Sequence, residues 1–397
     1  MKKISLPSEI FTRGVEEIIT QNELKERLLS GRKLTVKLGI DATSSDIHIG
    51  HATSLWKIRA LQEAGHKAVI ILGDSTTAIG DPTGRSKMRP VLEKKEIEGN
   101  IRSIKKQVAS ILLSDSGSLE FRKNSEWFSR MEVGEFLHIL SRVTHSRLIE
   151  RDMFQERMKK NTEIFMHELL YPILQGYDSV AIQSDVTVIG RDQLFNEHMG
   201  RFFQEQFGQD PQVIVALTIL PGMHGGEKMS KSLGNAILLS DSPQDMFGKA
   251  MSILDELIIP YLTVYTDVPE KTITDLKSDL ARGENPKDAK MAFAHALVRR
   301  YHGKKSADEE KERFCAVFLN RAAPKTGTRI SLEREQWNIL DLLVQLKLAS
   351  SKQDARRLVR QGAVEVGGEK AHDIKKEYSV KKGTIIRAGK HRIIEVQ

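Results

Sequence analysis

The feature that most constrains the fold is a continuous apolar run at residues 68–73. Such a run is typical of a parallel strand that is buried on both faces of a sheet. It follows another strand candidate at 33–39 and a helical pattern over 51–64. A strand, a crossover helix and a second parallel strand form a right-handed unit. With further strand patterns at 186–190 and 213–220, the sequence predicts an α/β fold with a parallel sheet.

The chain, with 397 residues, is too long for one compact domain. Residues 92–168 are mainly helical in pattern, which suggests an insertion at one end of the sheet. Later in the chain, Pro, Gly and Thr without apolar periodicity mark a linker. We expect a first domain over 1–240, an α-helical domain over 241–320, a linker over 321–336 and a small α+β domain over 337–397.

Cysteine content and charge limit the environment and the partners. The single cysteine, Cys315, excludes an intrachain disulfide and favours a reducing compartment. No apolar stretch approaches the length of a membrane span, so we expect a cytoplasmic protein with no membrane partner. Net charge is +8, and residues 338–397 hold 13 Lys and Arg against 7 Asp and Glu. This basic end fits a nucleic-acid partner or simply a well-solvated tail domain.

A polar loop between a strand and a helix occupies residues 39–51, and it ends in His-Ile-Gly-His. Free N–H groups and the helix dipole make the start of a helix an anion site. His48 and His51 share one face of the first turn, and Gly50 leaves room for a flat base to approach the backbone. Taken alone, the two histidines fit a helix cap equally well.

A second segment, Lys-Met-Ser-Lys-Ser at 228–232, follows a glycine-rich stretch. A mobile loop with two lysines can close over a polyphosphate and neutralise charge that develops during transfer. Taken alone, it also fits an ordinary solvated basic loop.

In this order, the two segments resemble the paired signature of class I aminoacyl-tRNA synthetases. Nucleotidyltransferases of the same superfold carry the first motif, but they lack the second loop and an RNA-binding tail. The resemblance implies a Rossmann-like catalytic domain that uses ATP as a substrate. It assigns catalysis to Thr43, His48, His51, Lys228 and Lys231. It assigns further ATP contacts to Gly39, Gly50, Met229, Ser230 and Ser232.

The segment 171–178 narrows the resemblance, because it is similar to the tyrosine-pocket helix of bacterial tyrosyl-tRNA synthetases. The resemblance assigns the substrate ammonium to Tyr171 and Gln175 and the phenol hydroxyl to Asp178. On an α-helix these positions share one face. A buried carboxylate that lacks its hydroxyl partner would disfavour phenylalanine. Without the class signature, Tyr171 and Gln175 would be read as core and cap residues.

Other positions match the same family. Asp81 lies in a Gly-Asp-Pro-Thr-Gly-Arg turn and is assigned to the substrate ammonium, and Asp41 to the amino-acid end of the site. Four more residues are assigned to ATP or pyrophosphate: Arg85, Arg89, Asp192 and Gln193.

At three positions this sequence differs from some or most members of the family. Ile189 and Arg191 stand where most members carry small residues near the ribose. Lys37 stands where one branch carries a second ligand for the phenol, and a longer bacterial branch carries lysine as here. No substrate role is assigned to Lys37.

The segment 348–368 resembles an S4-type RNA-binding domain. Ser351 is placed to cap a helix, and basic side chains follow on that helix. The residues expected to bind RNA are Lys352, Arg356, Arg357 and Arg360.

The resemblance therefore implies a tyrosine–tRNA ligase that works on L-tyrosine, ATP and tRNA(Tyr). We expect Mg²⁺ to accompany ATP, no tightly bound metal held by the protein, and a homodimer. Two alternatives stay open: a non-catalytic RNA-binding protein derived from a synthetase, and a related enzyme specific for tryptophan.

Overall fold

The computed structural model describes residues 8–81, 92–316, 329–330, 334, 336–346, 348–349, 351–374, 376–389 and 392–396. The chain forms two compact units, Met1–Gly303 and Lys304–Gln397. Each unit is described by itself. The four-part division expected from the sequence stays a prediction.

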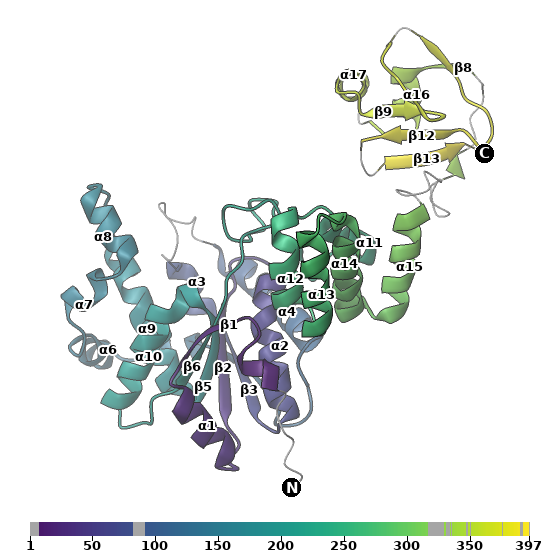
Figure 1. The fold of residues 1–397 in the computed structure, drawn as a ribbon. Coiled ribbons are helices and arrows are strands. Elements are labelled where there is room, and N and C mark those ends of the chain that lie inside the picture. The colour runs from purple at the N-terminus through teal and green to yellow at the C-terminus, as the bar shows by residue number, and fades with distance from the viewer. Residues whose placement is uncertain are drawn as a thin grey trace. The chain divides into compact units, whose positions relative to one another are not determined.

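A six-stranded sheet forms the centre of the first unit (Figure 1). Its strands lie in the order β1-β6-β5-β2-β3-β4, and only β1 runs antiparallel to its neighbour. The strand bounds are β1 Val15–Ile19, β2 Thr35–Asp41, β3 Lys67–Gly73, β4 Leu119–Lys123, β5 Val186–Gly190 and β6 Val213–Leu217. The predicted α/β fold with a parallel sheet is confirmed.

Two strands were not predicted from the sequence. β4 lies within the stretch 92–168 that reads as mainly helical, yet it pairs in parallel with β3. Its five residues, Leu-Glu-Phe-Arg-Lys, are all partly exposed and carry no long apolar run. β1 is an edge strand with two glutamates among its five residues. Both strands are stabilised by pairing with a neighbouring strand, and neither shows the apolar pattern by which a strand is recognised in a sequence.

The helices of the first unit cover both faces of the sheet. Figure 1 shows α2 and α4 on one side and α9 and α10 on the other. The helix bounds before β5 are α1 Gln21–Leu29, α2 Ile49–Glu63, α3 Asp74–Ile79, α4 Lys94–Ala109, α5 Ser125–Phe128, α6 Val133–Leu140, α7 His145–Ile149, α8 Asp152–Lys159 and α9 Met166–Ile182. After β5 follow α10 Leu194–Gln206, α11 Pro243–Met251, α12 Ile258–Tyr265, α13 Glu270–Ala281 and α14 Pro286–His302.

Strand alternation decides which side chains meet which helices. On β2, Val36 and Leu38 pack in the core with α2 and α4. Lys37 therefore points to the opposite face, toward Ser179 of α9 and Glu197 of α10.

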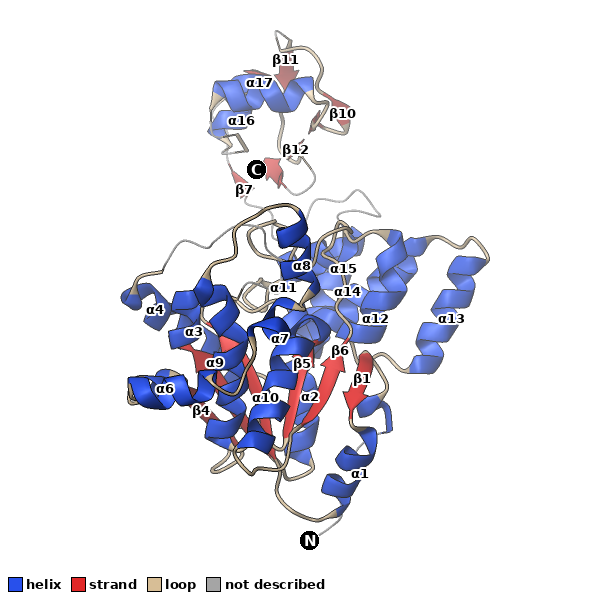
Figure 2. Ribbon diagram, turned by 90° about the vertical axis from the view of Figure 1, so that its left-hand side faces the viewer, coloured by secondary structure: helices blue, strands red, loops and turns tan. Residues whose placement is uncertain are grey.

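The order of the strands creates a switch point between β2 and β5. Figure 2 shows β5, β6 and β1 side by side on one side of this point. From β2 the chain builds outward through β3 and β4, and it then returns to place β5 on the other side of β2. In open α/β sheets, ligands bind beyond the carboxyl ends of the strands at such a point.

The second unit contains a helix, α15 Lys304–Phe314, and a small α+β fold. Its larger sheet has the order β10-β9-β12-β13-β7, and β8 pairs with β11. The bounds are β7 Arg329–Ile330, β8 Gln336–Asn338, α16 Ile339–Gln345, α17 Lys352–Arg360, β9 Val364–Val366, β10 Glu369–Lys370, β11 Glu377–Ser379, β12 Ile385–Ala388 and β13 Arg392–Val396. A separate hydrophobic core lies between these elements.

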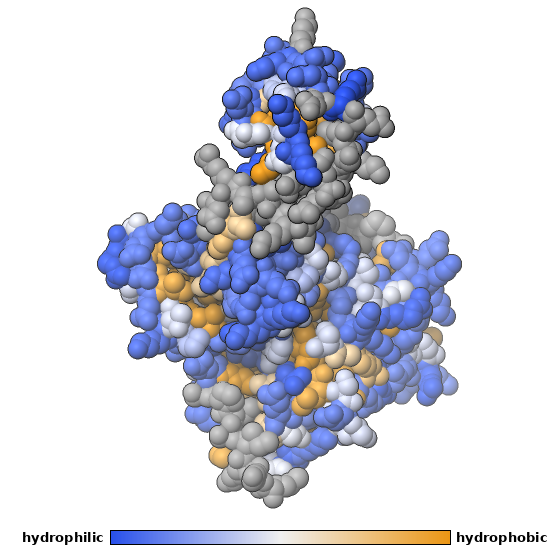
Figure 3. All heavy atoms as spheres, turned by 90° about the vertical axis from the view of Figure 1, so that its right-hand side faces the viewer, coloured by the Kyte–Doolittle hydropathy of each residue, from blue (hydrophilic) through white to orange (hydrophobic). Residues whose placement is uncertain are grey.

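The face drawn in Figure 3 is mostly hydrophilic, and its hydrophobic side chains form small scattered groups. Among the described residues, no helix combines the length and the apolar character needed to cross a membrane.

Candidate active site

A cavity of about 800 Å³ opens at the carboxyl ends of β2 and β5. Every described residue that the sequence analysis assigned to tyrosine, ATP or catalysis lines this cavity. These residues are Gly39, Asp41, Thr43, His48, Gly50, His51, Asp81, Tyr171, Gln175, Asp178, Asp192, Gln193, Lys228, Met229, Ser230, Lys231 and Ser232. Arg85 and Arg89 lie in 82–91, outside the described residues. The individual roles stay predictions.

Asp41 closes the inner end of the cavity. The Tyr171 hydroxyl donates to its Oδ2 at 2.9 Å, and the Thr76 hydroxyl donates to its Oδ1 at 2.7 Å. Burial and the neighbouring Asp41 carboxylate raise the pKa of Tyr171 well above its usual value, so the phenol remains a donor. The Asp41 carboxylate, at the end of β2, therefore joins this strand to Tyr171 of α9.

Gly73 makes this approach possible. A Cβ atom at residue 73 would lie 2.2 Å from Thr76 Oγ1 and 2.3 Å from Asp41 Oδ1. Neither Gly73 nor Thr76 belongs to a motif that can be recognised in the sequence. The available signal was a glycine at the end of a buried strand, which often marks a close approach of backbone and side chain.

Asp178 is buried on α9, and Trp127 Nε1 donates to its Oδ1 at 2.9 Å. Burial raises the pKa of Asp178 to about 8, although the Lys37 ammonium and the Trp127 hydrogen bond partly offset the effect. Trp127 was not predicted, because it lies on a different helix and belongs to no local pattern. A buried carboxyl of this kind is stabilised by a further hydrogen-bond donor such as a hydroxyl.

Amide side chains connect the residues assigned to the substrate ammonium. Asn196 Nδ2 donates to both Gln175 Oε1 and Gln193 Oε1, each at 2.9 Å. Gln193 Nε2 in turn donates to Asp81 Oδ2 at 2.9 Å. Gln175 and Asp81 are thus held by one chain of hydrogen bonds, in which Asn196 was not predicted.

The two histidines of the first motif lie together at the start of α2. Their ring centroids are 3.7 Å apart. His48 occupies the N-cap position, but its side chain makes no capping hydrogen bond. Burial, together with nearby His51 and Lys228, lowers the pKa of His48 to about 2, so the ring is neutral at neutral pH. Simple capping by the His48 side chain is therefore not what this motif does.

Gly50 leaves room for the His48 ring. A Cβ atom at residue 50 would lie 3.0 Å from His48 Nδ1 and Cε1. His48 Nδ1 is buried and has no hydrogen-bond partner among the described residues.

The loop with the second motif is tied to the cavity wall by both of its lysines. Lys228 Nζ donates to Asp192 Oδ2 at 2.9 Å, and Lys231 pairs with Asp46. Although burial alone would raise it, hydrogen bonds from Lys231, Ser45 and Ser240 hold the pKa of Asp46 below its usual value. Each of the two lysines of the loop therefore forms an ion pair with an aspartate of the cavity wall.

The backbone places the two motifs side by side. Ile49 N donates to Ile237 O at 3.0 Å, and Leu239 N donates to Ile47 O at 2.8 Å. The chain that leaves the second motif therefore passes directly beside the start of α2.

The three unusual positions have distinct surroundings. Arg191 pairs with Glu16 of β1, and Ile189 is buried in the cavity wall. Lys37 is 1% exposed and pairs with Glu197, whose Oε2 is 2.6 Å from its Nζ.

Among the described residues, no group of three or more His, Cys, Asp or Glu side chains is arranged to hold a metal ion.

In the second unit, α17 carries the residues assigned to RNA. Ser351 caps this helix, as predicted, by accepting from Asp354 N at 3.1 Å. Arg356, Arg357 and Arg360 are exposed around one surface depression. Lys352 pairs with Asp341 at 2.6 Å, and Arg357 pairs with Asp354 at 2.7 Å.

Comparisons with known proteins agree with this geometry. Residues 29–319 match the family model described as tRNA synthetases class I (W and Y). Residues 321–394 match a model described as a tyrosine–tRNA ligase C-terminal domain. The fold and the site thus define a class I aminoacyl-tRNA synthetase of the tryptophan and tyrosine group.

Similar proteins narrow the assignment. The chain is 42% identical over 389 residues to the tyrosine–tRNA ligase of Thermotoga maritima, covering 98% of this chain and 96% of that protein. It is 38% identical to the enzyme of Francisella tularensis, over 100% of this chain and 99% of that protein. The chain belongs to the tyrosine–tRNA ligase family.

The fold is also shared with solved structures. Tyrosyl-tRNA synthetase from Archaeoglobus fulgidus superposes with a TM-score of 0.59 at 22% identity, over 76% of this chain and 98% of that one. A mitochondrial tyrosyl-tRNA synthetase from Coccidioides posadasii gives a TM-score of 0.61 at 22% identity, over 78% of this chain and 92% of that one.

Proposed function

We propose that the chain activates L-tyrosine with ATP and then transfers the tyrosyl group to the 3′-terminal adenosine of tRNA(Tyr). The observation that carries this proposal is the single cavity at the switch point. It brings the buried acceptor Asp178 into one site with His48, Lys228 and Lys231.

At the tyrosine end, Asp178 accepts the phenol hydroxyl, and Tyr171, Gln175 and Asp81 receive the ammonium group. Asp41, which already accepts from the Tyr171 hydroxyl, lies at the amino-acid end of the site. The substrate carboxylate then points toward the phosphates. A nucleophile held in this way gains its rate from orientation.

At the ATP end, the tyrosine carboxylate oxygen forms a bond to the α-phosphorus, and the bond to pyrophosphate breaks. The carboxylate is already a nucleophile, so no general base is required. Thr43 and neutral His48 donate to the phosphates, and His51 packs near the adenosine. Lys228 and Lys231 neutralise the charge on the leaving pyrophosphate. Asp192 binds the ribose.

Mg²⁺ enters with ATP as part of the substrate. Magnesium is usually bound through substrate phosphates with one or two carboxylates, which does not require a preformed cage of protein ligands.

Transfer to tRNA requires contacts outside the cavity. The exposed arginines of α17 supply positive charge for phosphates. The helices α11 to α14 provide the remaining candidate surface of the first unit. We place this reaction in the cytoplasm, in keeping with a chain whose single cysteine forms no intrachain disulfide.

We further propose a homodimer. Five large apolar side chains are exposed on α6, α8 and the start of α9: Val133, Leu137, Met158, Phe165 and Met166. Figure 1 shows α6, α7 and α8 at one side of the first unit, beyond α9 and α10. Large apolar side chains that are exposed on neighbouring helices favour an interaction surface there. Light scattering on purified protein tests it: a monomer at micromolar concentration would exclude this dimer.

The activity is tested by amino-acid-dependent exchange of pyrophosphate into ATP, with each standard amino acid in turn. Exchange with tyrosine alone is the expected result. Exchange with tryptophan instead would keep the class but overturn the assignment of Asp178. No exchange with any amino acid, in a folded protein that binds RNA, would favour the non-catalytic alternative.

A further inference from the structure

A buried carboxylate, Glu197 of α10, lies at the cavity wall beside Gln175 and has no role in the reaction described above. Its side chain is 1% exposed. It accepts three hydrogen bonds: from Lys37 Nζ at 2.6 Å and Gln212 Nε2 at 2.7 Å on Oε2, and from Gln175 Nε2 at 2.9 Å on Oε1. An ionised carboxylate with this set of donors can only accept.

This constraint determines how Gln175 presents its amide. Because Glu197 must accept, the NH₂ end of Gln175 is turned toward it. The carbonyl end is then turned toward Asn196, which donates to it at 2.9 Å. An amide oxygen has a second lone pair, so this end can also accept from a substrate ammonium. The opposite orientation would place an NH₂ group against an ammonium, and both would be donors.

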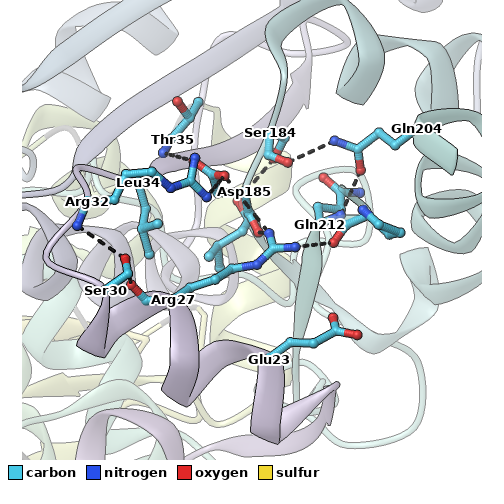
Figure 4. Close-up of polar contacts among 12 residues, drawn as sticks. Glu23, Arg27, Ser30, Arg32, Leu34, Thr35, Ser184, Asp185, Gln204 and Gln212 are labelled. Carbon is cyan, nitrogen blue, oxygen red and sulfur yellow. Dashed lines mark hydrogen bonds and ion pairs between the residues drawn. The ribbon is translucent and has the colours of Figure 1, made fainter. Parts of the chain in front are cut away.

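Glu197 is itself held by its neighbours. Gln212 is fully buried and is fixed through both backbone atoms: its N donates to Gln204 Oε1 at 2.8 Å and its O accepts from Arg201 at 2.6 Å. Figure 4 shows Gln204 between Ser184 and Gln212, so this contact belongs to a wider polar network at the far end of the sheet. On the other side, Lys37 also donates to Ser179 Oγ at 2.6 Å.

We propose that Glu197, paired with Lys37, is a positioning residue that orients the Gln175 amide so that its oxygen faces the amino group of the amino-acid substrate. This inference rests on the proposed tyrosine activation. It also gives Lys37 a role: the ammonium balances the Glu197 charge and does not bind the substrate. A buried pair kept only for stability would not be expected to affect one substrate group selectively.

The variant Glu197→Gln tests the orientation with almost no change in volume. The Lys37 ammonium can only donate hydrogen bonds. The new amide must therefore turn its oxygen to Lys37 and its NH₂ group to Gln175. Two donors then face each other, and Gln175 turns or loses its position. We expect the KM for tyrosine to rise at least about fivefold, as for the loss of one hydrogen bond. The KM for ATP and the kcat of exchange should be unchanged.

An analogue separates positioning from general damage. Tyrosine without its amino group is used as a competitive inhibitor of exchange. Its inhibition constant should be the same for the wild type and for Glu197→Gln, because the lost orientation affects only the ammonium. Equal weakening of tyrosine and of the analogue would overturn the proposal, as would an unchanged KM for tyrosine.

The matched control is Ser179→Ala, which removes the other partner of Lys37 but leaves Glu197 and Gln175 in contact; its KM for tyrosine should stay near the wild-type value. If Glu197→Gln does not fold, the double variant Lys37→Met/Glu197→Leu removes both buried charges, a change that proteins often tolerate. It should show the same selective rise in KM. Absence of tyrosine-dependent exchange in the wild type would instead overturn the proposed function itself.

Discussion

At the scale of single residues, the chemistry depends on ionisable side chains whose pKa is changed by burial and by neighbouring groups. Asp178 combines deep burial with a donor, Trp127, and a nearby cation, Lys37. The carboxyl is thereby kept close to the point at which it gains or loses its proton near neutral pH. Because Asp178 is assigned to the phenol hydroxyl of the substrate, its protonation should affect both tyrosine binding and the free energy of unfolding.

The pKa of Asp178 predicts a specific dependence of stability on pH. With a folded-state pKa of about 8 against 3.8, the native state keeps a proton that the unfolded state has lost. The stability from this proton is complete below about pH 4 and is lost as pH rises through about 8. Wild type should therefore lose more free energy of unfolding between pH 5 and 8.5 than Asp178→Asn, by about 1 kcal/mol or more. Urea denaturation at both pH values measures this.

The control for that experiment is Asp288→Asn, which makes the same chemical change at a side chain that is 82% exposed. It should follow the wild-type pH dependence. Identical pH dependence of wild type and Asp178→Asn would contradict the raised pKa.

Gly73 gives a second residue-scale prediction. A Cβ atom there must displace Thr76 or Asp41, because it would lie within 2.3 Å of both side chains. Gly73→Ala should cost about 1–3 kcal/mol of stability and raise the KM for tyrosine, since Asp41 lines the pocket. Gly248→Ala, with nothing within 4 Å in α11, is the control and should be neutral or slightly stabilising. A wild-type KM in Gly73→Ala would be the contrary result.

At the scale of elements, the loop of the second motif is ordered by one buried amide. Asn235 accepts from Ser230 N at 2.8 Å, and Gly222 leaves the space that its side chain occupies. A Cβ atom at residue 222 would lie 2.2 Å from Asn235 Nδ2. This hydrogen bond therefore helps to hold the backbone between Lys228 and Lys231.

Asn235→Ala should lower the kcat of exchange roughly fivefold, the effect of losing one hydrogen bond, while the KM for tyrosine is unchanged. Asn235→Asp keeps the acceptor for Ser230 N and should lie between wild type and alanine. Steady-state exchange kinetics with each substrate varied provide the measurement. A change confined to the KM for tyrosine would show that the loop does not act on the phosphates.

At the scale of the whole molecule, we expect the first compact unit to activate tyrosine and the second to contribute RNA binding. Replacing Arg356, Arg357 and Arg360 together by alanine should leave tyrosine-dependent exchange unchanged. It should weaken tRNA binding and make the affinity less sensitive to salt, by roughly one unit of slope for each phosphate that an arginine no longer neutralises. Filter binding at several salt concentrations measures both effects. Unchanged tRNA affinity would place the RNA surface elsewhere.

The motifs could be predicted from the sequence because each is local. His48 and His51 share one helical turn, and Tyr171, Gln175 and Asp178 share one face of α9, so chain geometry alone sets their spacing. The strands β2 and β3 are recognisable by their length and apolar character, and the α/β class follows from them. The short, polar β4 could not be found in this way, because a partner strand stabilises it.

The sequence by itself therefore determined the class of fold, the two signature motifs and the face of α9 that is assigned to the amino acid. Only the tertiary structure decided which distant groups complete them: Trp127 beside Asp178, Thr76 beside Asp41, and Glu197 between Lys37 and Gln175. The physical reason is that hydrogen bonds between separate elements depend on how strands and helices pack. Packing depends on the whole core, and no local spacing records it.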